Sequence, residues 1–175
     1  MHLLTRFVIV LTLLAGTASV LVRGQSTDAQ LVRLKQLFPS ATSFSPKGGE
    51  PPHITVYGGP KSDTVIGYAF WTTEVSPLER GYGGPIVMLM GIDTKGILSG
   101  LIVIEHHEPY GDFSIDRAAF TAQFRGKDVR DPFKLGGDID AVSRATITMS
   151  SAVRAIRSSA RRMARELITP PGAKP

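Results

Sequence analysis

A segment near the carboxyl end of the chain gathers hydroxyl and carboxyl side chains directly ahead of a long stretch with helical apolar periodicity. Asp138, Asp140, Ser143, Thr146 and Thr148 all fall within it. Such residues ahead of a helix are typical of an amino-terminal cap. The same helix end offers unpaired N–H groups and a partial positive charge, which suit a phosphate. The residues alone therefore leave two interpretations open, a helix cap and a hydroxyl-rich anion site.

The run Glu105-His106-His107-Glu108 suggests a metal site at first sight. On a strand, alternate residues share a face, so each face would carry only two of these four side chains. Catalytic zinc usually takes three protein ligands, and the chain holds only two more histidines. We therefore expect a polar strand end here and no metal site.

Two other groups of residues could form a ligand site. Glycines in residues 80–85 could let the backbone approach a ligand closely, although their spacing is not that of a dinucleotide fingerprint. A flexible hairpin loop is the alternative. Asp131, Asp138 and Asp140 could bind a divalent cation, but solvated loop acids are far commoner. No serine–histidine arrangement or P-loop is present, so we expect no catalytic residues.

Composition is that of an ordinary globular domain, and 175 residues give room for one. Hydrophobic residues make up 42% of the chain and charged residues 20%. There is no cysteine, which excludes disulfides, thiolate catalysis, cysteine-ligated iron–sulfur clusters and c-type haem attachment.

The amino-terminal segment is read as an export signal. Arg6 precedes an apolar run, residues 7–22, which Arg23 closes. As a helix this run would be about 24 Å long, short of a bilayer core of about 30 Å. The small residues 15–19 could supply a cleavage site, so a cleaved signal peptide and a retained anchor are both compatible. Either one exports the remainder of the chain.

The expected elements define an α+β domain with an antiparallel β-meander of about four strands. Helices are expected at 29–38, capped by Asp28, at 115–124 and at 149–168. Strands are expected at 53–57, 64–73, 85–92 and 96–104. We predict an export segment at 1–24, an amphipathic helix and loop at 25–52, the main domain at 53–168 and a disordered tail at 169–175.

The last expected helix carries five arginines, at positions 154, 157, 161, 162 and 165, against a single acid, Glu166. Most of the formal net charge of +5 therefore lies on this helix. Such a face could meet anionic lipid, acidic protein or nucleic acid, or it could be a solvated face opposite the core. An exported chain meets little DNA, so we expect no nucleic-acid partner and consider an anionic membrane surface the more sensible one.

Residues 140–146 resemble the flavinylation motif of FMN-binding domains, found in sodium-pumping quinone reductases, Rnf complexes and the NosR/NirI regulators of denitrification. In that motif an acid is followed after two residues by Ser or Thr, usually Gly, then Ala and Thr. The last Thr carries FMN through a phosphoester. The resemblance implies attachment at Thr146 and FMN contacts from the rest of the motif and its neighbour: Asp140, Ser143, Arg144, Ala145 and Thr148.

One departure from the motif is Arg144, which stands where glycine is usual. Glycine there could serve a backbone with φ above zero or a close approach of the ligand. Arginine adopts such a backbone only at a cost, but it could contact a phosphate in a bidentate way.

Two further segments extend the resemblance to the NosR/NirI type. Residues 81–86 are similar to a Tyr-Ser/Gly-Gly-x-Pro-Ile segment, and residues 103–109 are similar to a Val-Glu-His-His-Glu-Pro run of that type. In quinone-reductase and Rnf relatives the matching region reads His-x-Glu-Thr-Pro and lines the flavin site. The resemblance implies that Tyr82 lies against the isoalloxazine, where an aromatic face suits stacking. It also places near FMN the residues Gly83, His106, Glu108 and Pro109.

The function implied is an exported, FMN-binding electron-transfer module rather than an enzyme with its own substrate. Its expected partners are the flavin transferase that attaches FMN, to which Asp140 matters, and other redox proteins or membrane-complex subunits. We expect it at the periplasmic side of the inner membrane, anchored by residues 7–22 or released by cleavage. The alternative is a non-redox regulatory or binding module that has lost covalent flavin through the change at Arg144.

Overall fold

The computed structural model describes residues 18–59 and 63–168. Most of the predicted export segment and all of the predicted tail lie outside these residues. The chain divides into two compact units, residues 1–34 and 35–175. Among the described residues, no helix combines the length and apolar character needed to cross a bilayer.

Helix α1 (Ala18–Leu37) forms the described part of the first unit and continues into the second. The described helix already runs from Ala18 through Asp28, so the predicted start behind Asp28 is wrong. Aspartate favours helix caps but is tolerated inside a helix, and no proline interrupts the segment that precedes it. The helix ends just before Pro39, where a proline restricts the preceding residue.

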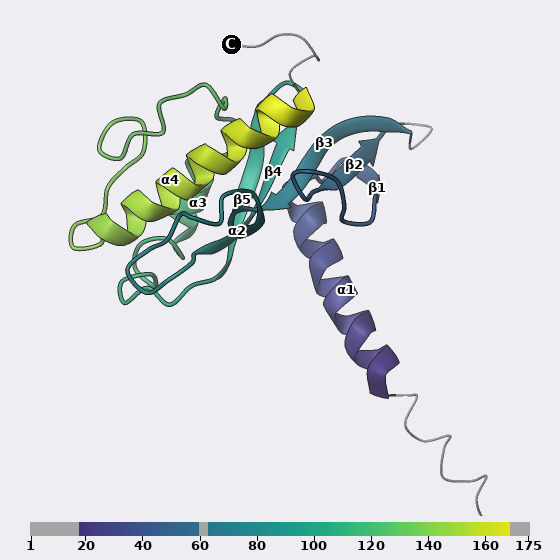
Figure 1. Ribbon diagram of the computed structural model, residues 1–175, viewed down its shortest axis with the longest axis horizontal. Coiled ribbons are helices and arrows are strands. Elements are labelled where there is room, and N and C mark those ends of the chain that lie inside the picture. Colours follow the sequence, from purple (N-terminus) through teal and green to yellow (C-terminus); the bar gives the residue numbers. More distant parts are fainter. Residues whose placement is uncertain (1–17, 60–62, 169–175) are drawn as a thin grey trace, which may run out of the picture. The chain divides into compact units, whose positions relative to one another are not determined.

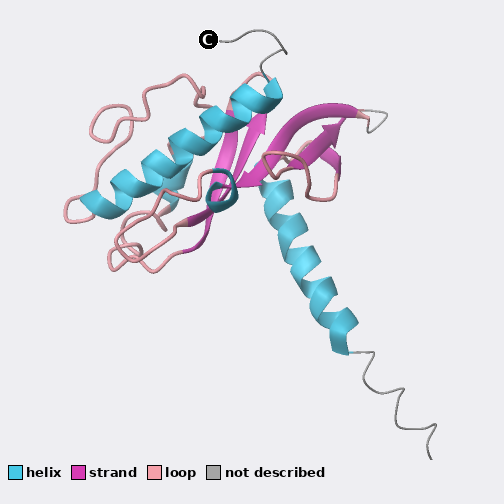
Figure 2. Cartoon of the chain, in the orientation of Figure 1, coloured by secondary structure: helices cyan, strands magenta, loops and turns pink. Residues whose placement is uncertain are grey.

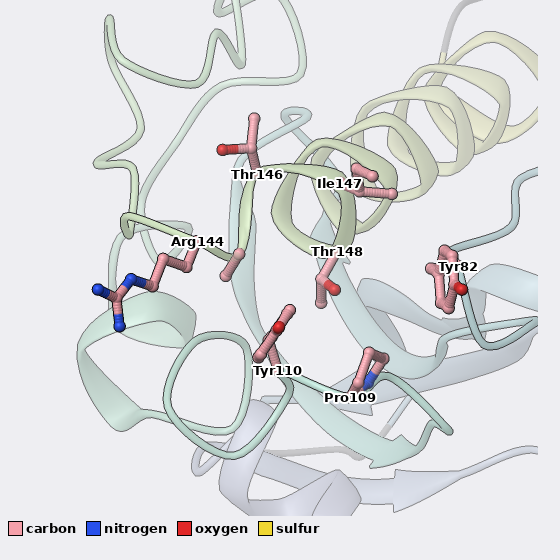
Figure 3. A pocket seen from close by; sticks show the side chains of 8 residues that line it. Tyr82, Pro109, Tyr110, Arg144, Thr146, Ile147 and Thr148 are labelled. Carbon is pink, nitrogen blue, oxygen red and sulfur yellow. The ribbon is translucent and has the colours of Figure 1, made fainter.

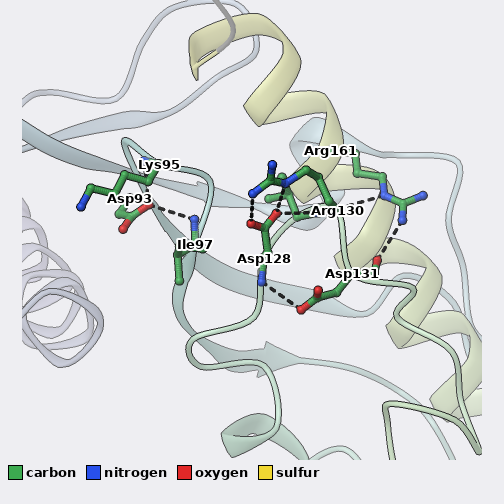
Figure 4. Close-up of polar contacts among 8 residues, drawn as sticks. Asp93, Lys95, Ile97, Asp128, Arg130, Asp131 and Arg161 are labelled. Atoms are coloured by element: carbon green, nitrogen blue, oxygen red, sulfur yellow. Dashed lines mark hydrogen bonds and ion pairs between the residues drawn. The ribbon is translucent and has the colours of Figure 1, made fainter. Parts of the chain in front are cut away.

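The second unit contains a five-stranded antiparallel sheet in the order β1-β2-β3-β4-β5, which confirms the predicted α+β class and meander (Figures 1 and 2). Its strands are β1 (Ala41–Phe44), β2 (Ile54–Gly58), β3 (Thr64–Trp71), β4 (Val87–Asp93) and β5 (Leu98–Glu105). The hairpin between β4 and β5 turns on Asp93, whose carboxylate accepts the amides of Lys95 at 2.8 Å and Ile97 at 2.9 Å (Figure 4).

Strand β1 lies in a segment that the sequence predicted as loop. It is only four residues long and pairs with β2, with Phe44 opposite Val56. A strand this short shows little alternation, and the Ser-, Pro- and Gly-rich residues that follow it are typical of a loop. Its strand conformation therefore comes from pairing with β2 rather than from a local pattern.

Helix α4 (Thr146–Met163) packs across one face of the sheet and continues as a π-helical turn, Ala164–Ile168 (Figure 1). Its buried stripe includes Met149, Ile156, Ala160 and Met163, close to the periodicity read from the sequence. The helix starts three residues before the predicted start at Met149, so Thr146, the last residue of the resembling motif, opens its first turn and the other motif residues directly precede the helix.

The remaining helices are short. Helix α2 (Thr72–Val75) follows β3 directly and was not predicted, and helix α3 (Ala118–Ala122) is shorter than the predicted 115–124. Ile115 and Phe124 at the predicted ends are both fully buried, so the apolar spacing was read correctly while the backbone around α3 forms turns. Together these turns carry the chain from β5 toward α4.

Candidate functional site

A cavity of about 540 Å³ opens at the start of α4, where three segments distant in sequence meet (Figure 3). These segments are the glycine-rich loop before β4, the chain just beyond β5 and the first turn of α4. The cavity falls within the size range of small-molecule sites. Its lining consists of Tyr82, Pro109, Tyr110, Arg144, Ala145, Thr146, Ile147 and Thr148.

The structure thus gathers part of the predicted set. Six predicted residues line the cavity, namely Tyr82, Pro109, Arg144, Ala145, Thr146 and Thr148. Gly83, His106, Glu108, Asp140 and Ser143 are not among its lining residues. Sequence reasoning did not single out Tyr110 and Ile147, although each directly follows a predicted residue and both leave a large apolar side chain exposed.

The first turn of α4 presents its backbone amides without a capping side chain. The N-cap residue is Ala145, and among the described residues no side chain bonds to this helix end. Of the two interpretations left open by the sequence, the structure excludes a hydroxyl cap, because the N-cap alanine has no hydroxyl group. No acidic residue lies in the first turn. The unpaired N–H groups and the positive end of the helix dipole remain available to an anion.

Thr146 and Thr148 differ sharply although both lie in this turn. Thr146 is exposed, and Figure 3 shows its side chain pointing away from Thr148. Thr148 is 2% exposed, and its hydroxyl donates a hydrogen bond of 2.5 Å to Oε2 of Glu108. The Thr146 hydroxyl is accessible to a reagent from solution, whereas the Thr148 hydroxyl is buried and already engaged.

Arg144 adopts a left-handed backbone with φ of 70°. Glycine enters this region freely, whereas a residue with a Cβ atom pays about 1 kcal/mol or more. The backbone conformation that a glycine would favour is thus kept here with an arginine in place. The side chain of Arg144 is exposed and extends outward beside the cavity (Figure 3).

Glu108, which does not line the cavity, connects two of its walls, the glycine-rich loop and the first turn of α4. Its side chain belongs to a residue only 6% exposed, and Oε1 accepts the amide of Gly83 at 2.7 Å while Oε2 accepts Thr148. A Cβ atom on Gly81 would lie 2.1 Å from Oε1 of Glu108, and one on Gly83 would lie 1.9 Å from the carbonyl oxygen of His107. These glycines therefore allow the loop to pack against the chain beyond β5.

His106 supports Glu108 rather than lining the cavity. Its Nδ1 accepts the backbone amide of Glu108 at 3.1 Å, and its Nε2 lies 3.1 Å from both carboxylate oxygens of Asp116. A Cβ atom on Gly111 would lie 1.9 Å from the imidazole ring, so the ring also fits closely against that backbone. Strand β5 ends at Glu105, so the expected alternation of faces does not apply beyond it.

His106, Asp112 and Asp116 bring potential metal ligands within 4.8 Å of one another. The hydrogen bonds of the imidazole oppose that use. Because Nδ1 accepts an amide proton, a neutral ring carries its own proton on Nε2, the atom that a metal would need bare. The geometry fits an Nε2–H donor to Asp116.

The acidic side chains considered for a cation have separate structural uses. Asp138 accepts Lys127 at 3.0 Å and the amides of Phe133 and Lys134 at 3.1 and 2.6 Å. Partial burial opposes ionisation of Asp138, but these hydrogen bonds outweigh it and hold its pKa below the ordinary value. Asp131 accepts the amide of Asp128. In the described part of the chain these acids form no metal-binding group.

The residues present fit a flavin mononucleotide. Uncapped amides at the start of α4 suit the phosphate, and the exposed rings of Tyr82 and Tyr110 suit a planar heterocycle. The cavity has the volume of a cofactor site and no acidic residue among those lining it.

Comparison with known proteins supports an FMN site in the same part of the chain. The family described as FMN-binding domain matches residues 81–161. Regulatory protein NosR of Stutzerimonas stutzeri is 31% identical over 153 residues, which cover 82% of this chain and 20% of NosR. A subunit of the ion-translocating oxidoreductase complex of Erwinia tasmaniensis is 33% identical over 120 residues, 63% of this chain and 55% of that protein.

The corresponding protein of Methanosarcina acetivorans, also named as a subunit of an ion-translocating oxidoreductase complex, is 30% identical over 146 residues, which cover 75% of this chain and 73% of its own length. The chain spans about a fifth of NosR and about half of the Erwinia protein, so it corresponds to one part of those proteins. With the matched family and the cavity geometry in agreement, this chain belongs to the FMN-binding domain family, and its cofactor is FMN.

Proposed function

We propose that the chain is an electron-transfer module whose FMN is linked to Thr146 through a phosphoester. The observation that carries this proposal is the contrast between the two threonines of the first turn. Thr146 is exposed beside uncapped helix amides, whereas Thr148 is buried against Glu108. A phosphate attached at Thr146 would lie at the positive end of α4, where backbone amides stabilise its charge.

Attachment requires a separate flavin transferase and an activated flavin phosphate as donor. The Thr146 hydroxyl oxygen forms a new bond to phosphorus while the donor's bond to its leaving group breaks, and the hydroxyl proton leaves with that group or a base. The exposed hydroxyl gives the transferase access. No electron is gained or lost in this step.

Once FMN is bound, the redox chemistry belongs to the cofactor, and the protein supplies position and electrostatics. Tyr82 and Tyr110 offer aromatic faces at the cavity, and Glu108 fixes the loop that carries Tyr82 through the Gly83 amide. Arg144 adds a cation beside the phosphate position, which compensates for the glycine that it replaces.

Relatives of this chain are named as subunits of ion-translocating oxidoreductase complexes. On that basis the module passes electrons to or from other subunits of a membrane complex. Residues 7–22 direct it to the periplasmic side of the inner membrane, either as an anchor or as a cleaved signal. Fusing the chain to a phosphatase that is active only after export tests this placement, and an inactive fusion would contradict it.

The attachment test compares two hydroxyl deletions in the full chain, co-expressed with a flavin transferase. Thr146→Val removes the proposed acceptor, and Ser143→Ala removes a nearby hydroxyl as the matched control. After denaturing electrophoresis, the native chain and Ser143→Ala should show flavin fluorescence, and Thr146→Val should show none. Covalent fluorescence that persists in Thr146→Val would move the acceptor to Thr148 or elsewhere.

A further inference from the structure

A second cavity, of about 340 Å³, lies along α4 beyond the flavin site. We call it the basic groove, because three of its lining side chains are cations and none is a carboxylate. Its lining consists of Pro132, Phe133, Lys134, Leu135, Ser150, Val153, Arg154 and Arg157. Phe133 and Val153 are buried, so the floor is apolar while the cations surround it.

The arginines of α4 divide into those used by the fold and those left for a partner. Arg161 donates to the carbonyl oxygens of Val129 at 3.1 Å and Asp131 at 2.9 Å (Figure 4), and Arg162 donates to Val75 and Glu50. These two guanidinium groups are therefore tied to neighbouring loops. The five arginines of this helix are therefore not all available to a partner.

The cations of the basic groove are much less engaged. Arg154 bonds to Glu79 and Ser151, but the side chains of Lys134 and Arg157 make no hydrogen bond or ion pair with any other described residue. Asp138, whose carboxylate accepts the backbone amide of Lys134, pairs with the ammonium group of Lys127 instead. Within the described part of the chain, two cations thus face an apolar-floored cavity without a neutralising group.

The loop that carries Lys134 is held in place. Phe133 adopts φ of 47°, a strained backbone for a residue with a Cβ atom. Asp138 fixes this turn by accepting the amides of both Phe133 and Lys134. A preorganised cation loses less freedom when it binds a partner than one on a mobile loop.

The basic groove also lies close to the proposed flavin attachment. Ser150 is one helical turn beyond Thr146, about 6 Å along the axis, and Arg157 is about 16 Å beyond it. A protein seated in the groove would therefore lie beside the cavity that holds the flavin. Transient redox complexes have small interfaces and rely on complementary charge for rapid encounter.

We propose that the basic groove docks an acidic surface of the protein that exchanges electrons with this module. The role in electron exchange rests on the proposed function, whereas the acidic docking itself does not. A concave site with a buried apolar floor accepts a protruding acidic loop. The methylene groups of its acidic side chains would fill the groove, and their carboxylates would contact Arg157 and Lys134. A flat lipid surface would reach only cations that project from the protein.

The test uses the full chain and a fluorescein-labelled peptide of about ten glutamates, which is an unstructured acidic probe. Binding is followed by fluorescence anisotropy at about 10 mM ionic strength, where charge interactions are weakly screened. Arg157→Glu should weaken binding about fivefold and the Lys134→Glu, Arg157→Glu double variant about twentyfold, since exposed pairs contribute modestly and independently. At about 200 mM salt these differences should shrink.

The matched control is Arg165→Glu, which makes the same charge change on the exposed π-helical turn outside the groove. It should alter peptide binding less than about twofold. Equal losses in Arg165→Glu and Arg157→Glu would overturn the proposal, because binding would then follow net charge alone. Binding to vesicles of equal phosphatidylcholine and phosphatidylglycerol, lost in Arg157→Glu while the peptide does not bind the native chain, would overturn it in favour of a membrane.

Repeating the peptide titration with Thr146→Val tests the docking proposal independently of the proposed flavin attachment. This variant should bind the peptide as tightly as the native chain, because Thr146 lies outside the groove. If Thr146→Val keeps its covalent flavin, the proposed attachment fails while the docking result stands. If it binds the peptide as weakly as Arg157→Glu, the docking surface is not the basic groove.

Discussion

The two cavities along α4 offer positive charge to a ligand in different ways. The proposed flavin cavity has its positive character mainly from backbone amides at the helix start, where the cap is Ala145 and no acid follows in the first turn, with Arg144 as the one cationic side chain in its lining. The basic groove one turn further has it from Lys134, Arg154 and Arg157. Backbone charge is fixed by geometry, whereas side-chain charge responds to substitution and salt. Ligand binding at the first cavity should therefore be lost when its walls move, and binding at the second should be lost when its charged side chains are changed.

The largest effect is expected at Glu108, which joins the walls of the flavin cavity. Glu108→Ala leaves the Thr148 hydroxyl and the Gly83 amide without their acceptor, at a cost of about 2–4 kcal/mol. Urea denaturation should show this loss, and FMN affinity should fall as the Tyr82 loop is released. Peptide binding at the basic groove should persist at temperatures where the variant is folded. A variant as stable as the native chain would show that this link is unimportant.

Gly83→Ala tests the close contact between the same walls. The added methyl would meet the His107 carbonyl at 1.9 Å, so the loop must move, and we expect about 1–3 kcal/mol of destabilisation. Gly48→Ala is the matched control, since nothing lies within 4 Å of its Cβ position. Thermal unfolding monitored by circular dichroism compares the two. Equal stability in both variants would contradict the packing role given to Gly83.

Arg144→Gly should act in the opposite direction on stability. Glycine relieves the left-handed backbone at φ of 70°, and although it adds freedom to the unfolded chain, we expect a net gain of about 0.5–1 kcal/mol. The same change removes a cation beside the phosphate position. Chemical denaturation of the flavin-free chain isolates the backbone effect, and Arg144→Ala, which keeps a Cβ atom, is the control. A destabilised Arg144→Gly would show that the arginine side chain holds the fold.

The smallest effect on stability is expected for substitution of Asp138, which holds the Lys134 loop of the basic groove. Its pKa is lower in the folded chain than in the unfolded one, because its hydrogen bonds outweigh the effect of burial. The ionised carboxylate therefore contributes stability above its unfolded pKa of about 4, and this contribution is lost as the pH falls toward the lower folded value. Acid titration of stability should be shallower in Asp138→Asn. An unchanged titration would mean that Asp138 does not hold the Lys134 loop.

The sequence predicted elements best where a long pattern repeats. The buried stripe of α4 and the β-branched runs of β3 and β5 indicated the meander and the final helix. Short elements escaped, because β1 and α2 are each four residues long and owe their conformation to neighbours. The start of α1 was misplaced because Asp28 carries the chemistry of a cap without acting as one.

For the site, the sequence identified six residues that line the first cavity but not the contacts that they make. Thr146 and Thr148 were singled out together, but only the fold distinguishes an exposed hydroxyl from one bonded to Glu108. The proximity of His106 to FMN stays a prediction, and the contacts that the fold gives its ring are to Asp116 and the Glu108 amide. Such partners come from segments brought together by the sheet, which spacing in sequence does not specify. The basic groove was hidden for the same reason, because Lys134 and Arg157 meet only in the folded chain.

The most direct test of the account is to locate the flavin on the chain. Trypsin cleaves after Arg144 and Arg154, so peptide 145–154 contains both candidate threonines. Fragment-ion mass spectrometry of this peptide, from protein co-expressed with a flavin transferase, should place one FMN phosphoester on Thr146. FMN on Thr148, on another peptide or on none would contradict the central claim.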